Sequence, residues 1–175
     1  EVLTNLSSTK NNIILDFNYT ASTRLILKQC GLSDEDIDNR LIKVHGEASN
    51  NDIIFGVEDN AGIKKEHVFL RKAYNIKYKA LNFSELYDRI KSVAIFGHSL
   101  GETDHTYFNK LFQESCMYNK FSTNNNKEFW LFYYKENGYH CMMQQLDSLT
   151  HNILTSFRQY NRVNFINTDK EKVFI

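Results

Sequence analysis

The sequence predicts an α/β fold, a Rossmann-like three-layer arrangement with a mainly parallel sheet. Short apolar runs typical of buried strands alternate along the chain with segments whose apolar residues recur at helical spacing. The first such runs, residues 12–19 and 41–45, are separated by one predicted helix, which favours a βαβ unit with parallel strands. With 175 residues, 42% of them hydrophobic, the chain is large enough for a single domain over residues 1–175.

The N-terminal elements are each marked by hydrophobic pattern or polar composition. We expect a strand over 12–19, a helix over 21–30, a loop or one-turn helix over 33–38, a strand over 41–45, a polar turn over 47–51 and a strand over 52–57. Residues 25–27 and Cys30 would share the apolar face of the first helix, and Gly31 would end it.

The remaining elements continue the alternation. We expect partial helix over 64–80, a helix capped by Ser84, a strand over 92–96, an amphipathic helix marked by residues 107–112, an aromatic strand over 129–134, a turn over 135–138 and a strand over 163–166. Apolar residues at three- and four-residue steps from Met143 to Phe157 predict one long helix before the last strand.

Charge and cysteine content narrow the classes of function. Lys plus Arg and Asp plus Glu both number 21, so no net field draws the chain to nucleic acid or to an anionic membrane. No run of about 18 apolar residues occurs, so we expect no membrane span. Cys30, Cys116 and Cys141 lack a Cys-x-x-Cys spacing, which predicts free, mostly buried thiols, a cytoplasmic location and no bound metal. Four histidines without ligand spacing are expected at the surface: His67, His105, His140 and His151.

Polar residues follow three of the predicted strands, at the edge where open α/β sheets bind ligands. They are Asn18, the pair His45-Gly46, and the loop Gly97-His98-Ser99-Leu100. Each has a structural alternative, because a strand-end Asn often caps a helix and a His-Gly pair often forms a turn. The Gly97 loop could likewise be a tight turn followed by a cap.

Together these segments predict a nucleotide site. Backbone N–H groups after Gly97 can hold a phosphate, and the Ser99 hydroxyl can bond a ribose or phosphate oxygen. The His45 imidazole can accept a ribose hydroxyl proton or steer a water, which the Asn18 amide can hold. We therefore expect Asn18, His45 and Ser99 to converge on one pocket, suited to a nucleotide with a glycosidic bond to cleave.

Two acidic residues and one strand leave alternatives open. Asp16, inside an apolar strand, either orients a neighbouring loop or points to solvent at a sheet edge. Asp104 is either a ligand contact or, with Thr103, the N-cap of the following helix. The aromatic strand over 129–134 belongs in the core or at a contact between copies of the chain.

The order of these motifs resembles the bacteriophage abortive-infection AbiH family. The resemblance covers roughly residues 12–115 and rests on Asn18-Tyr19, on His45-Gly46 with residues 53–56, and above all on residues 95–104, IFGHSLGETD. Members usually begin with a strand and a Gly-Asn-Gly-Phe-Asp-type loop. The resemblance therefore implies the C-terminal part of a longer protein that lacks its N-terminal strand and Gly-rich loop.

The same series is similar in order to the sirtuin-like NAD-binding fold, which includes NAD-cleaving defence enzymes. This likeness implies NAD as ligand or substrate, with Asn18 and His45 as catalytic residues. The residues it implies for NAD binding are Gly97, His98, Ser99 and Asp104. Sirtuins have an Asp where Thr20 stands here, and their four-Cys zinc module has no counterpart, so protein deacylation is not expected.

Two classes of function stay open. The leading interpretation is a phage-defence protein with a nucleotide-binding, NAD-cleaving site. The alternative is a non-catalytic sensor that recognises a phage component or a nucleotide and relays this to partners. A nuclease is not expected, since paired carboxylates with metal-ligand spacing are missing from the sequence.

Overall fold

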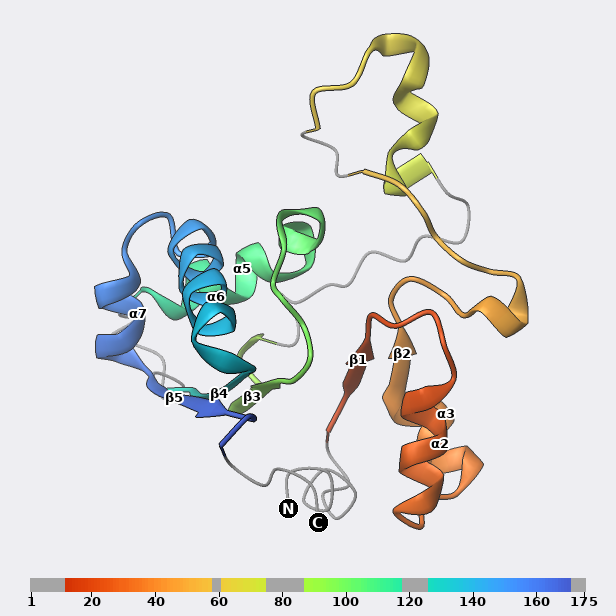
Figure 1. The fold of residues 1–175 in the computed structure, drawn as a ribbon, viewed down its shortest axis with the longest axis horizontal. Helices are drawn as coiled ribbons and strands as arrows, with labels where there is room; N and C mark the ends of the chain where they lie inside the picture. The colour runs from red at the N-terminus through yellow and green to blue at the C-terminus, as the bar shows by residue number, and fades with distance from the viewer. Residues whose placement is uncertain (1–11, 58–60, 75–86, 118–125, 171–175) are drawn as a thin grey trace. The chain divides into compact units, whose positions relative to one another are not determined.

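The computed structural model describes residues 12–57, 61–74, 87–117 and 126–170. The chain divides into two compact units, unit 1 with residues 1–79 and 173–175, and unit 2 with residues 80–172. Each unit contains its own small parallel sheet (Figure 1). An α/β fold with parallel strands is therefore confirmed.

Unit 1 is built around the predicted βαβ motif. Its elements are β1 (Ile14–Asp16), α2 (Ser22–Gln29), α3 (Asp34–Arg40) and β2 (Leu41–Lys43). The strands β1 and β2 pair in parallel, with Ile14 opposite Leu41 and Asp16 opposite Lys43. The expected strand, helix and parallel strand are confirmed, although each strand is shorter than the apolar run that predicts it.

Local side chains explain where the helices of unit 1 begin and end. The Ser33 hydroxyl accepts a hydrogen bond from the Asp36 N–H at 3.1 Å and caps α3, which runs longer than the predicted single turn. Gly31, with φ +88°, follows α2 as expected. The predicted apolar face of α2 was too wide, because only Leu27 is buried while Leu25 and Ile26 are exposed.

The strand predicted over 52–57 does not form. This segment makes one isolated bridge, Val57 to Arg71, and is flanked by the short 3-10 helices η1 (Ala48–Asn50), η2 (Lys65–Leu70) and η3 (Lys72–Tyr74). An apolar run becomes a strand only beside a partner ladder, and no described residue continues one here. The predicted partial helix over 64–80 is confirmed as 3-10 turns up to Tyr74, while residues 75–80 and Ser84 lie outside the described residues.

Unit 2 carries the larger sheet. Its strands β3 (Ser92–Ile95), β4 (Glu128–Tyr133) and β5 (Arg162–Asn167) lie in the order β3-β4-β5 and are parallel throughout. Ile95 pairs with Leu131, and Tyr133 pairs with Asn167, so the carboxyl ends of all three strands meet at one edge. These strands confirm the predictions for 92–96, 129–134 and 163–166.

Three helices pack on this sheet and enclose an aromatic core. They are α5 (His105–Ser115), α6 (Lys135–Leu149) and α7 (Leu154–Tyr160), and Figure 1 shows them on one side of the strands. Phe112, Phe129 and Phe157 are fully buried, with ring centroids 4.8–5.6 Å apart. The core interpretation of the aromatic strand is thus confirmed, and so is the amphipathic helix marked by residues 107–112.

Two predictions for unit 2 are wrong. The turn expected over 135–138 is the first turn of α6, which follows β4 after a single residue. The long helix expected up to Phe157 is interrupted between α6 and α7, where His151 and Asn152 have φ values of +51° and +63°. The buried face of α6 accordingly contains Met142, Leu146 and Leu149 rather than Met143.

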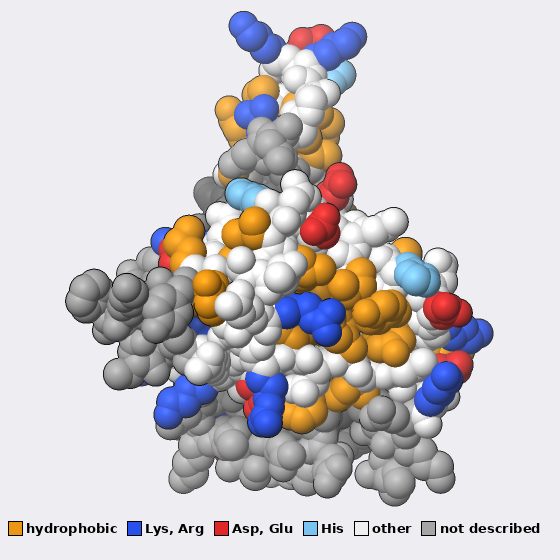
Figure 2. Space-filling view, turned by 90° about the vertical axis from the view of Figure 1, so that its left-hand side faces the viewer, with side chains coloured by type: hydrophobic (Ala, Val, Ile, Leu, Met, Phe, Trp, Pro, Cys, Tyr) orange, Lys and Arg blue, Asp and Glu red, His pale blue; other side chains and the backbone are white. Residues whose placement is uncertain are grey.

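Among the described residues visible in Figure 2, Lys and Arg side chains lie beside hydrophobic and acidic ones. All three cysteines are free, as expected, but only Cys116 is buried. Cys30 and Cys141 are exposed, so the expectation of mostly buried thiols is wrong.

Within the described residues, no helix is both long and apolar enough to cross a membrane.

Candidate functional site

The buried carboxylate of Asp16 organises the strand-end loop of unit 1. One of its oxygens accepts a hydrogen bond from the Asn18 N–H at 2.9 Å, and the other lies 2.9 Å from the Lys43 ammonium on the neighbouring strand. Asp16 is 4% exposed. The loop-orienting interpretation of this residue is therefore confirmed, and the solvent-facing one is wrong.

The Lys43 ammonium holds the rest of this loop. It donates to the carbonyl oxygens of Asn18 at 2.5 Å and Thr20 at 2.6 Å. The α2 helix begins after Ala21 without a side-chain cap, so Asn18 is not the cap. Its exposed amide bonds to no side chain or backbone among the described residues, while its backbone N–H and carbonyl are held by Asp16 and Lys43.

His45 lies in a turn after β2 and packs between aromatic rings. Its ring is 5.4 Å from that of Phe17, edge to face, and is stacked 5.8 Å from that of Tyr19. The next residue, Gly46, has φ +72°, and a β-carbon there would lie 2.1 Å from the carbonyl oxygen of Asp52. The turn interpretation is confirmed, and the His45 side chain is only 5% exposed.

The Gly97 loop of unit 2 leaves the carboxyl end of β3 with unusual backbone geometry. Gly97 has φ +64°, and Leu100, which is fully buried, has φ +55°. Non-glycine residues in this region are uncommon and concentrate at ligand sites. Gly97 and Ser99 are exposed, and their N–H groups donate to no residue that the structure describes. The loop thus presents two backbone donors beside a hydroxyl.

His98 fixes this loop. Its Nδ1 accepts the Leu100 N–H at 2.9 Å, and its Nε2 lies 3.3 Å from a carboxylate oxygen of Asp104. In the neutral ring the proton is therefore on Nε2 and points at Asp104. Asp104 occupies the N-cap position of α5 but makes no capping bond with its side chain. Both ring nitrogens of His98 serve the loop, which makes it a positioning residue.

One histidine of unit 2 differs from expectation. His105 is half-buried, and its Nε2 contacts the carbonyl oxygen of Leu100 at 3.0 Å and the Gln145 side-chain oxygen at 2.9 Å. This contact ties α6 to the Gly97 loop, so the surface assignment of His105 is wrong. The remaining three are exposed, as predicted: His67, His140 and His151.

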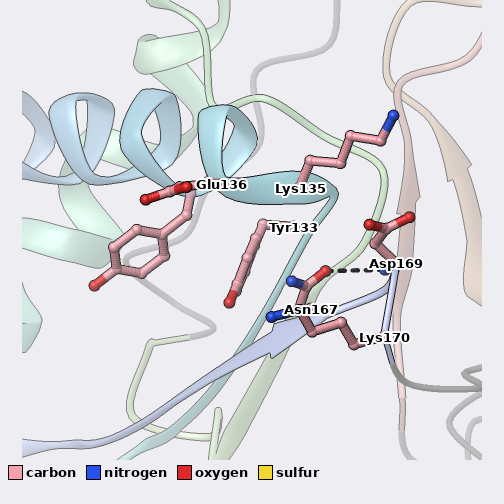
Figure 3. A pocket seen from close by; sticks show the side chains of 7 residues that line it. Tyr133, Lys135, Glu136, Asn167, Asp169 and Lys170 are labelled. Carbon is pink, nitrogen blue, oxygen red and sulfur yellow. Dashed lines mark hydrogen bonds between the residues drawn. The ribbon is translucent and has the colours of Figure 1, made fainter.

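A pocket of about 410 Å³ opens at the carboxyl ends of β4 and β5. It is lined by Tyr133, Lys135, Glu136, Tyr139, Asn167, Asp169 and Lys170 (Figure 3). Sequence reasoning missed it because residues 135–138 were expected to form a plain turn. The available signal was the polar sequence directly after each of the two strands, the same signal that identified Asn18 and His45.

The predicted site residues fall in two groups. Asn18 and His45 belong to unit 1, where Tyr19, the neighbour of Asn18, stacks on the His45 ring. The other group, in unit 2, comprises Gly97, His98, Ser99 and Asp104. The convergence of Asn18 and His45 with Ser99 stays a prediction. Among the described residues, no group of three or more His, Cys, Asp or Glu side chains is arranged to hold a metal ion.

Comparison with known proteins gives one match. A family model described as bacteriophage abortive infection AbiH matches residues 2–125. The matched span contains Asn18, His45 and the Gly97 loop, and it ends before β4. No curated protein and no solved structure gives a significant match.

Proposed function

The chain belongs to the AbiH family of bacteriophage abortive-infection proteins, and we propose that it serves this role by binding a nucleotide. A role in abortive infection follows from the family. Nucleotide binding is our extension of it. The proposal includes a cytoplasmic site of action, supported by the free thiols, and a Rossmann-like three-layer fold, supported by the parallel ladder β3-β4-β5.

The observation that carries the proposal is the Gly97 loop at the carboxyl end of a parallel strand. Open α/β sheets bind ligands at this edge. The N–H groups of Gly97 and Ser99 and the Ser99 hydroxyl are donors suited to phosphate or ribose oxygens. The loop is held by His98 before any ligand arrives, so binding need not supply the free energy of ordering it.

The finer form of the proposal is NAD cleavage by Asn18 and His45. Water would attack the ribose carbon after nicotinamide leaves, giving nicotinamide, ADP-ribose and a proton. Asn18 fits this role because its amide is exposed on an anchored loop. His45 fits less directly, since Tyr19 stacks on its ring and must move before the imidazole can reach a sugar.

The burial of His45 therefore favours a second candidate, a sensor that binds the nucleotide without cleaving it. Both candidates require nucleotide binding. They differ only in whether nicotinamide is released, so one set of proteins tests both.

Calorimetric titration with NAD and AMP tests binding. Ser99→Glu places a negative charge beside the proposed phosphate and should weaken affinity at least about tenfold, equal to about 1.4 kcal/mol. The matched control is Ser92→Glu, the same change at the opposite end of β3, which should leave affinity unchanged. If the wild type binds neither nucleotide, or both variants behave alike, nucleotide binding at this loop is wrong.

Release of nicotinamide from NAD separates the enzyme from the sensor. The enzyme proposal expects release by the wild type and its loss in Asn18→Ala and His45→Ala, with affinity largely kept. Binding without release supports the sensor and rejects cleavage by this chain.

A further inference from the structure

The pocket of unit 2 lies outside the span matched by the family model and uses none of the residues assigned above. Its position follows from the register, because Tyr133 and Asn167 pair at the ends of β4 and β5. The chain leaves β4 into α6 through Lys135, a non-glycine residue with φ +56°. The volume of about 410 Å³ is within the range of small-molecule sites.

One wall of the pocket is fixed by hydrogen bonds. The Thr168 N–H and hydroxyl both donate to the carbonyl oxygen of Tyr133, at 2.8 and 3.0 Å, and join the exit of β5 to that of β4. The Asn167 side-chain oxygen accepts the Asp169 N–H at 2.9 Å, a contact drawn in Figure 3. These bonds hold Asp169 at the mouth of the pocket.

The charged groups around the mouth are available to a ligand. Lys135, Asp169 and Lys170 form no ion pair with any residue in the described parts of the chain, and Figure 3 shows the two lysines on either side of Asp169. Lys135 instead lies over the Tyr134 ring at 4.9 Å. The Lys170 ammonium can pair with a phosphate, and the first turn of α6 adds N–H donors at the same edge.

The remaining groups suit a sugar. The carboxylate of Asp169 accepts hydrogen bonds from hydroxyls, and the Asn167 amide nitrogen, which has no partner among the described residues, donates one. Tyr133 and Tyr139 form an aromatic wall, with ring centroids 5.2 Å apart. A purely anionic ligand would be repelled by the two carboxylates of the lining, Glu136 and Asp169. A ligand with both a phosphate and hydroxyls can meet a lysine with its phosphate and the carboxylates with its hydroxyls.

We propose that this pocket binds a phosphorylated sugar, with Lys170 on the phosphate and the carboxylates of Asp169 and Glu136 on the sugar hydroxyls. The site goes beyond the proposed function, since it does not require the Gly97 loop to bind a nucleotide. Ribose 5-phosphate is the probe.

Calorimetry on the full chain tests the site. Ribose 5-phosphate should bind more tightly than ribose or inorganic phosphate. Lys170→Gln should weaken it about tenfold, while Lys110→Gln, the same change on the exposed side of α5, should have no effect. Asp169→Asn should weaken ribose 5-phosphate but strengthen inorganic phosphate, because it removes the negative charge and replaces one of the two accepting oxygens with an NH2 donor.

Any of three results would overturn the site. The protein could fail to bind ribose 5-phosphate, it could bind a free amino acid such as glycine more tightly than ribose 5-phosphate, or the Lys110 and Lys170 variants could have equal effects. Loss of ribose 5-phosphate binding in Ser99→Glu, with Lys170→Gln unaffected, would assign the sugar phosphate to the Gly97 loop and reject the pocket. Failure of NAD and AMP to bind would reject only the proposed function.

Discussion

The Lys43 ammonium lies 2.9 Å from a carboxylate oxygen of Asp16 and joins the two strands of unit 1 through their side chains as well as their backbone. Lys43→Met should lower the free energy of unfolding of this unit by about 3 kcal/mol, because it leaves the Asp16 charge buried without its partner. Amide exchange of β1 and β2 measures the effect.

The control for this change is Lys28→Met, which breaks the exposed pair with Asp34. Exposed pairs contribute little to stability, so protection should hardly change. Equal losses of amide protection in the two variants would show that the Asp16–Lys43 contact stabilises the fold no more than an exposed ion pair does.

Gly46 is predicted to be the least replaceable glycine of unit 1. Gly46→Ala forces a positive φ on alanine and places its β-carbon 2.1 Å from the Asp52 carbonyl oxygen. Gly31→Ala has the same backbone strain, at φ +88°, but meets open space, so it should cost only about 1 kcal/mol. The midpoint temperature of thermal unfolding should be clearly lower for Gly46→Ala than for Gly31→Ala. Equal stability would contradict the close approach.

The three thiols should differ in reactivity. Burial raises the pKa of the Cys116 thiol to about 11, so almost none of it is thiolate near neutral pH. An alkylating reagent should modify Cys30 and Cys141 in the native protein and reach Cys116 only after denaturation. Mass spectrometry of the peptides reports each site. Rapid native labelling of Cys116 would show that α5 opens readily.

Much of the fold could be predicted because its signals are local. The apolar runs ending at Asp16 and Ile95 are strands, and the helical spacing of Tyr107, Phe108 and Leu111 marks a buried face. The prediction of a strand over 52–57 was wrong because strand formation depends on a pairing partner elsewhere in the chain, and the local sequence pattern carries no information about that partner. The break in the helix after Leu149 was not predicted, for a related reason. Apolar spacing continues through it while the backbone turns at His151.

The site was predictable only as far as single residues. Strand-end position predicted that polar residues such as Asn18 and Ser99 follow the strands, and the structure places both in loops. It could not show that His98 has both ring nitrogens occupied, because Leu100 and Asp104 become its partners only through the fold. The pocket between β4 and β5 was missed because its two sides come from residues about 34 positions apart, a separation that the strand register alone brings together.

His98 should carry its proton on Nε2 in the neutral ring. The Leu100 N–H occupies Nδ1, and Asp104 accepts from the other nitrogen. Nitrogen-15 NMR of the imidazole distinguishes the two tautomers. Asp104→Ala should speed amide exchange at Leu100, whereas Asp104→Asn keeps a side-chain oxygen for the contact and should preserve most protection. A protonated Nδ1 in the neutral ring would contradict the assigned role of His98.

Lys127 predicts how the stability of unit 2 depends on pH. Its side chain is buried, and its ammonium donates to the carbonyl oxygens of Tyr87 and Ile90, each at 2.7 Å. Burial lowers the pKa of Lys127 from its ordinary value of 10.5, so the unfolded chain binds this proton more tightly than the folded one. The free energy of unfolding should therefore rise as pH increases from the lowered pKa towards 10.5, where the unfolded chain also loses the proton. Urea unfolding followed by the fluorescence of Trp130 on β4 measures this free energy at each pH.

Two variants serve as controls. Lys127→Met should lack the rise of the unfolding free energy with pH, and Lys110→Met, which alters an exposed lysine, should keep it. Identical pH profiles for the wild type and Lys127→Met would contradict the burial of this charge.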